Sequence, residues 1–263
     1  MNRNEILSQV KQIALEVGNF VRNERENFLP SSALQKAKND LVSYVDTTSE
    51  KLIVDKLKQI LPDAGFITEE GYESKRLTRN WIIDPLDGTT NFVHGIPCYA
   101  ISIGLEENGK VILGVVYEIS RNELFFAIEG GGAFLNGNSI HVSNVSDFNS
   151  ALIATGLPVN NFSKMTAYLQ TLEFFMRNTH GIRRIGAASV DLCYLACARV
   201  DAFYEFNLSP WDVAAGSLIA CEAGAKVTDF SSGNSFLFGR EIMAANPKLY
   251  DSFANVISAS FVD

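Results

Sequence analysis

The sequence lacks any apolar run long enough to cross a membrane as a helix. Such a span takes about 20 consecutive apolar residues, and no stretch of the 263-residue chain approaches that length. The segment 1–23 carries apolar residues at helical spacing with charges between them, which is typical of an amphipathic surface helix rather than a signal peptide. We therefore expect a soluble, cytoplasmic protein with no membrane partner.

Cysteine is also scarce, and its spacing argues against redox or zinc chemistry. The four cysteines, Cys98, Cys193, Cys197 and Cys221, form no CxxC pair, so the thiol pairs typical of disulfide exchange and zinc binding are missing. Cys193 and Cys197 lie four residues apart in an apolar stretch, where small buried thiols are common. Core packing is favoured for them, with a redox or metal role as the weaker alternative.

Basic residues are outnumbered, with 22 Lys and Arg against 30 Asp and Glu, and the formal net charge is −8. No cluster of Lys and Arg stands out, so no direct nucleic-acid partner is expected. An acidic protein that binds an anionic substrate needs local cations to offset the repulsion, and bound metal ions are the strongest ones available.

Two kinds of pattern divide the chain into halves that we expect to form a single compact unit. In the first half, helices are predicted over 4–27 and 46–61, the second capped by Thr47 or Thr48, and strands dominate from 65 to 143. The second half alternates strands (151–156, 182–185, 202–205) with helices (164–178, 189–198, 212–223). The polar stretch 141–150 separates an N-terminal lobe, 1–145, from a C-terminal lobe, 146–263.

The most informative segment is the run WIIDPLDGTTNF at 81–92. A buried-type strand ends at Asp84, Pro85 predicts a bend, and Asp87 follows, so both carboxylates can converge on one side of a strand-to-helix turn. Gly88 permits close approach of a ligand to the backbone, and the free N–H groups of Gly88 and Thr89 form an anion site. Carboxylates beside a phosphate cradle are what Mg²⁺ uses. A plain Asp-Pro turn is the less favoured alternative.

Four further acids follow apolar segments or open helices. The strand GFIT at 65–68 ends in Glu69 and Glu70, and the spacing alone does not choose between them. Asp212 opens an apolar helix, and Asp46 follows a strand-like run that enters a helix. On spacing alone, helix capping is the favoured role for Asp46 and Asp212.

Taken in order, these segments resemble the inositol monophosphatase family over nearly the full length of the chain. The matching pieces are DLV at 40–42 with Asp46, FITEE at 66–70, WIIDPLDGTTNFVH at 81–94, GAFLNG at 132–137, WDVAAG at 211–216 and EAGA at 222–225. The resemblance implies an α/β (α+β) fold, a layered α/β/α/β/α sandwich. It also implies a homodimer and sensitivity to lithium.

The resemblance assigns roles to individual residues. It implies that two or three Mg²⁺ ions are held by Glu69, Asp84, the backbone carbonyl of Leu86, Asp87 and Asp212. Asp46 and Thr89 are similar to the pair that orients and deprotonates the attacking water, with Glu69 as the third catalytic residue. The substrate is expected to contact Asp87, Gly88, Thr89, Gly186, Ala187, Ala188 and Glu205.

The implied reaction is Mg²⁺-dependent hydrolysis of a small phosphorylated polyol or sugar, with myo-inositol monophosphate as the first candidate. Ala187 departs from the Thr that the inositol enzymes often carry, which puts one hydroxyl contact in doubt. Fructose 1,6-bisphosphate, histidinol phosphate and a nucleotide phosphate are the alternative substrates. A regulatory binding protein with residual phosphatase activity is the alternative of another class.

Overall fold

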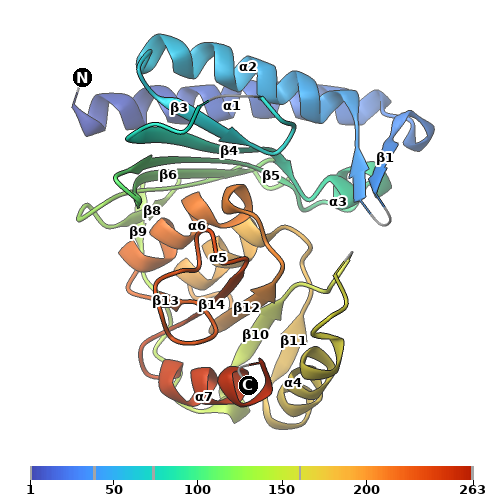
Figure 1. The fold of residues 1–263 in the computed structure, drawn as a ribbon, viewed down its shortest axis with the longest axis vertical. Helices are drawn as coiled ribbons and strands as arrows, with labels where there is room; N and C mark the ends of the chain where they lie inside the picture. Colours follow the sequence, from blue (N-terminus) through green and yellow to red (C-terminus); the bar gives the residue numbers. More distant parts are fainter. Residues whose placement is uncertain (1, 38–39, 73–74, 160, 262–263) are drawn as a thin grey trace.

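Helices and sheets alternate in five layers in the computed structural model, which describes residues 2–37, 40–72, 75–159 and 161–261 (Figure 1). The layers run from α1 and α2, through a seven-stranded sheet, α5 and α6, and a five-stranded sheet, to α4 and α7. The predicted α/β/α/β/α sandwich is confirmed. Among the described residues, no helix has the length and apolar character needed to span a bilayer.

The first layer consists of α1 (Arg3–Asn27) and α2 (Tyr44–Ile60), as the helical spacing predicted. The prediction that Thr47 or Thr48 caps α2 is wrong, because the cap is Ser43, whose hydroxyl accepts the N–H of Val45. The Ser43 N–H donates to Asp46 at 2.8 Å, which completes a capping box. A short hairpin of β1 (Leu34–Ala37) and β2 (Asp40–Val42) precedes the helix.

The seven-stranded sheet runs in the order β3-β4-β5-β6-β7-β8-β9. Its strands are β3 (Gly65–Thr68), β4 (Arg79–Asp87), β5 (Ala100–Glu107), β6 (Lys110–Glu118), β7 (Glu123–Ile128), β8 (Ala133–Leu135) and β9 (Asn138–Ile140). The strand that was expected to end before Pro85 continues to Asp87, because a shift of register against β5 between Asp84 and Asp87 accommodates the proline. The short helix α3 (Thr89–His94) follows directly.

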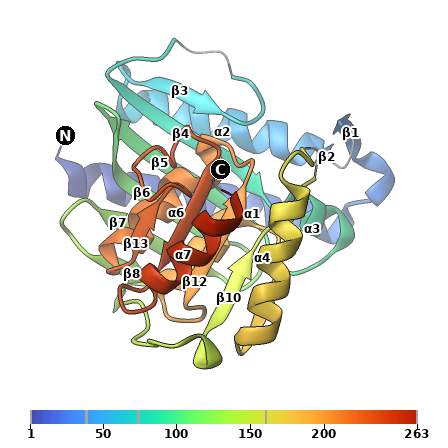
Figure 2. The ribbon, with the colours of Figure 1, turned by 60° about the horizontal axis from the view of Figure 1, so that its bottom comes forward.

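The five-stranded sheet has the order β11-β10-β12-β14-β13. Its strands are β10 (Leu152–Thr155), β11 (Gly181–Arg183), β12 (Ala202–Phe206), β13 (Lys226–Thr228) and β14 (Glu241–Ala245). Helices α5 (Ala188–Ala196) and α6 (Pro210–Glu222) lie between the two sheets and are apolar on nearly every side. Helices α4 (Met165–Asn178) and α7 (Tyr250–Phe261) lie side by side over the outer face (Figure 2). Strand β10 pairs in parallel with both β11 and β12, as in an α/β unit.

The seven-stranded sheet lies wholly before residue 145, and the five-stranded sheet lies wholly after it. Helix α6, from the C-terminal half, packs on β4, β5, β6 and β7 of the N-terminal half. The division into lobes 1–145 and 146–263 stays a prediction.

Candidate metal and phosphate site

Carboxylates from separate stretches of the chain line one pocket of about 170 Å³. Strands β3 and β4 are parallel, with Thr68 beside Ile83, so the residues that follow, Glu69 and Asp84, reach the same edge of the sheet. Asp212 comes from the first turn of α6, which packs on the same sheet. The pocket is lined by Glu69, Asp84, Leu86, Asp87, Gly88, Thr89, Thr90, Val159, Arg184, Gly186 and Asp212.

The turn at the end of β4 is held by its own side chains. The N–H of Leu86 donates to Asp84 Oδ1 at 2.9 Å, and the hydroxyl oxygen of Thr89 lies 3.0 Å from the Leu86 carbonyl oxygen. These bonds fix a carboxylate and a carbonyl oxygen at the rim of the same pocket.

Gly88 occupies a position that other residues would not tolerate. Its φ of +90° lies in the left-handed region. A Cβ there would lie 3.1 Å from the carbonyl oxygen of Cys98 and 3.2 Å from that of Gly186. This close approach brings the segment that begins at Gly186 against the start of α3.

Thr89 connects the pocket to a buried acid behind it. Its hydroxyl lies 2.7 Å from Asp46 Oδ1, while Asp46 Oδ2 accepts the N–H and the hydroxyl of Ser43 at 2.8 and 2.6 Å. Asp46 is fully buried and does not line the pocket. It therefore completes the capping box of α2 and also contacts Thr89, so a role at the start of the helix does not exclude a place in the site.

Asp87 is held from the C-terminal half of the chain. Its Oδ2 accepts the backbone N–H of Ser189 at 2.8 Å and also the Ser189 hydroxyl. Asp212 shows the same double use as Asp46, because it accepts the N–H of Ser209 at 2.7 Å while it lines the pocket. Each of these acids thus has a fixed orientation set by a serine.

Burial and mutual repulsion oppose ionisation of the clustered acids. Burial, followed by the charges of Glu69, Asp87 and Asp212, raises the pKa of Asp84 well above its usual range. Burial and the charge of Asp87 raise the pKa of Asp212 to about 8. Burial likewise raises the pKa values of Asp87 and Asp46, against the hydrogen bonds from Ser189 and Ser43. A divalent cation would relieve this repulsion.

The donor set fits Mg²⁺ in chemistry, since it consists of carboxylates and one carbonyl oxygen around a shared space. Within the described ranges, no three His, Cys, Asp or Glu side chains are already arranged as a ready-made metal site. The four acids that line the pocket are therefore candidate metal ligands, and a bound ion would bring them closer together.

Metal-free protein is expected to lose stability as the pH rises. Asp84 and Asp212 have raised pKa values, so the stability they contribute is fully present below the usual carboxyl pKa and is lost as the pH rises through their raised pKa values, which for Asp212 is about 8. Thermal unfolding in EDTA should give a lower Tm at about pH 8.5 than at about pH 5, and Mg²⁺ should raise Tm most at the higher pH. A flat metal-free profile with no effect of Mg²⁺ would contradict this expectation.

Some predicted site residues lie apart from the pocket. Gly186 lines it, whereas Ala187 and Ala188 are buried behind it. Glu205 lines an adjoining pocket instead. Of the two acids after β3, Glu69 lines both pockets, and the backbone N–H of Glu70 donates to Glu50 at 2.7 Å.

Glu50 and Arg184 were missed by the sequence analysis. Glu50 is buried on the same face of α2 as Asp46 and also accepts the N–H of Tyr72 at 3.1 Å, so it fixes the loop that carries Glu69. The sequence could have indicated Glu50, because a residue four positions after Asp46 on a helix lies on the same face. Arg184 also lines the pocket, and the only feature of the sequence that could have indicated it is its position two residues before Gly186.

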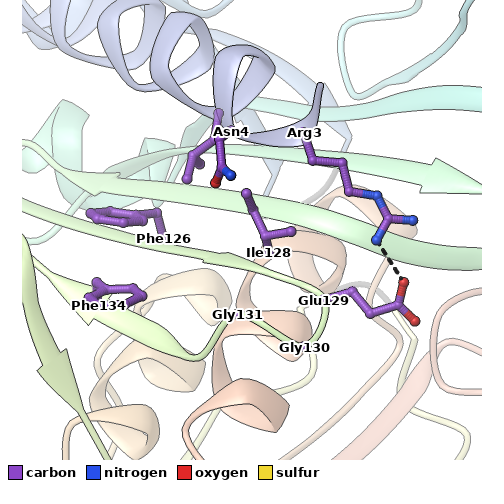
Figure 3. A pocket seen from close by; sticks show the side chains of 9 residues that line it. Arg3, Asn4, Phe126, Ile128, Glu129, Gly130, Gly131 and Phe134 are labelled. Carbon is purple, nitrogen blue, oxygen red and sulfur yellow. Dashed lines mark hydrogen bonds and ion pairs between the residues drawn. The ribbon is translucent and has the colours of Figure 1, made fainter. Parts of the chain in front are cut away.

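A larger cavity, of about 510 Å³, lies between α1 and β7 (Figure 3). Its charged side chains, Arg3 and Glu129, pair with each other at 3.2 Å, and its other walls include the rings of Phe126 and Phe134. It contains one acid and no hydroxyl side chain, so its lining offers no cluster of oxygen ligands for a metal ion.

The sequence model of the inositol monophosphatase family matches residues 2–260. The chain belongs to the inositol monophosphatase family. Two solved structures share its fold over most of the chain. The extragenic suppressor protein suhB from Bartonella henselae has a TM-score of 0.91 and 37% identity, with 96% of this chain and 98% of that one covered. The Thermotoga maritima IMPase has a TM-score of 0.89 and 33% identity, with 97% and 98% covered.

Family members with similar sequences carry a different kind of name. A relative from Neisseria meningitidis serogroup B, called a putative Nus factor SuhB, is 45% identical over 258 residues, which cover 97% of this chain and 99% of the relative. The Nus factor SuhB of Escherichia coli K12 is 38% identical over 246 residues, or 93% and 92% of the two chains. The family is thus established, while its members are named both for an enzyme and for another role.

Proposed function

We propose that this protein hydrolyses a small phosphate monoester with the help of Mg²⁺, and that myo-inositol monophosphate is the first substrate to test. The observation that carries the proposal is the convergence of Glu69, Asp84, Asp87 and Asp212 on one pocket beside the Thr89–Asp46 pair. Membership of the inositol monophosphatase family supports the same chemistry.

Glu69, Asp84, Asp87, Asp212 and the Leu86 carbonyl would hold two or three Mg²⁺ ions. Bound Mg²⁺ neutralises a substrate phosphate and lowers the pKa of water. The backbone N–H groups of Gly88 and Thr89 would bind phosphate oxygens. Thr89 would orient the attacking water and pass its proton to Asp46, because a threonine hydroxyl is too weak a base to keep it. No covalent intermediate with the protein is needed.

A second candidate is a regulatory role of the kind that the name Nus factor denotes, which is related to transcription. The naming of the relatives at 45% and 38% identity favours it. It argues against the expectation of no direct nucleic-acid partner, which rests on the net charge of −8 and on the lack of a cluster of Lys and Arg in the sequence. The two roles are compatible on one chain, since the pocket occupies a small part of its surface.

Phosphate release from a panel of monoesters, with Mg²⁺ and with EDTA, tests the enzymatic proposal. We expect Mg²⁺-dependent turnover of inositol 1-phosphate or of another member of the panel, inhibition by lithium, and a dimer in solution. Binding without turnover on every ester would reject the hydrolase proposal and leave the regulatory one.

A further inference from the structure

A second pocket, of about 240 Å³, adjoins the carboxylate pocket. The two pockets share Glu69, Val159, Arg184 and Asp212. Glu205, which was expected to contact the substrate, lines this second pocket, with Trp211 on its apolar wall. A monoester with its phosphate beside Gly88 therefore has its alcohol beside these residues.

Two guanidinium groups face this space. Arg184 is exposed and lines both pockets, and within the described part of the chain it makes no hydrogen bond or ion pair. A Cβ on Gly186 would collide with its guanidinium, so the absence of a side chain at Gly186 lets Arg184 lie close to the phosphate cradle. Its donors are available to a ligand.

Arg240, which also lines the second pocket, is held in place. Its Nε and Nη2 donate to the side-chain oxygen of Asn207 at 3.2 and 3.0 Å, and Nη2 also lies 3.2 Å from the Asn207 carbonyl. Its Nη1 has no such partner among the described residues. Asn207 thus orients a guanidinium that lines the second pocket.

The charges of the second pocket suit an anion better than a neutral polyol. Glu69 and Asp212 also face the carboxylate pocket, where cations would offset them. Glu205 is then the one remaining acid among the lining residues, against two arginines. Guanidinium groups bind carboxylate and phosphate in pairs of charge-assisted hydrogen bonds, whereas neutral hydroxyls gain little from a full positive charge.

We propose that the substrate carries a second oxyanion on its alcohol part, a phosphate or a carboxylate, bound by Arg184 and Arg240. The inference rests on the proposed hydrolase function and narrows its substrate class. Glu205 would accept a hydrogen bond from a hydroxyl of the same alcohol. Arg184 and Arg240 are then specificity-determining residues.

Matched pairs of esters test the proposal and identify the oxyanion. Fructose 1,6-bisphosphate and fructose 1-phosphate differ by one phosphate, and 3-phosphoglycerate and glycerol 3-phosphate differ by one carboxylate. With Mg²⁺, the wild type is expected to favour the member with the second oxyanion about tenfold or more in kcat/KM in at least one pair. Arg184→Gln and Arg240→Gln should each remove most of that preference, with a larger rise in KM on the member that carries the second oxyanion than on the other member.

The control is Arg177→Gln, an exposed arginine on α4 that pairs with Glu173 away from both pockets. It should leave every ratio unchanged, and the Tm of all three variants should match the wild type. Equal or better turnover of the members without the second oxyanion, or equal losses on both members of a pair, would overturn the inference and leave the hydrolase function standing. Failure to hydrolyse any ester would instead reject the hydrolase function itself, and the inference with it.

Discussion

Replacing Asp84 with asparagine is expected to lower kcat/KM for the best monoester by about 10²–10³-fold, and at the same time to raise the Tm of the metal-free protein. Activity falls because the site loses a charged oxygen ligand that stabilises the transition state electrostatically. The turn should survive, because the amide oxygen of asparagine can still accept the Leu86 N–H.

The gain in stability has the same origin as the loss of activity. Asp84 is 2% exposed and lies beside Glu69, Asp87 and Asp212, so an ionised Asp84 repels its neighbours when no cation is present. Removal of this charge should raise Tm by roughly 2–4 °C for each kcal/mol of repulsion relieved. Function here is expected to cost stability.

The matched control for Asp84→Asn is Asp251→Asn, at a side chain that is 91% exposed and lies 3.7 Å from Lys226. That substitution should change neither turnover nor Tm beyond experimental error. Full activity of Asp84→Asn with Mg²⁺ would remove Asp84 from the ligand set.

Thr89→Ala is expected to lower kcat by about 10²–10³-fold, with a smaller change in KM. The hydroxyl donates at 2.7 Å to Asp46, and without it no group in the pocket links the attacking water to that buried acid. Steady-state kinetics with the best monoester of the panel would measure both constants.

Thr89→Ser is the natural control, because it keeps the hydroxyl and removes one methyl group. It should retain most of the activity that Thr89→Ala loses. If alanine and serine lose equally, the hydroxyl has no part in proton transfer and Thr89 acts through packing alone.

The sequence predicted the helices and the first sheet well because their patterns are local. Helices α1 and α2 show apolar residues at a spacing of three and four, and the run at 81–92 combines a buried strand with its acids. The strands β13 and β14 and the helix α7 went unpredicted. Met243 of β14 and Phe253 of α7 belong to a core assembled from distant segments, which also includes Tyr204.

The candidate site shows a similar division. Asp84 and Asp87 stand out in the sequence because they share one short segment. Glu69 can be added to them once β3 is known to pair in parallel with β4. The bond from Ser189 to Asp87 spans 102 residues and joins the start of α5 to the end of β4. No local pattern predicts such a contact. The capping role of Ser43, by contrast, could have been predicted, since Ser43 stands three residues before Asp46, as in a capping box.

The most direct test of the account is a crystal structure with Mn²⁺ in place of Mg²⁺, with the ions located by their anomalous scattering. We expect at least two Mn²⁺ ions in the pocket, each bound at about 2.0–2.4 Å by oxygens from the set Glu69, Asp84, Leu86, Asp87 and Asp212. Crystals of catalytically active protein in which Mn²⁺ avoids this pocket, or is bound by other residues, would contradict the account.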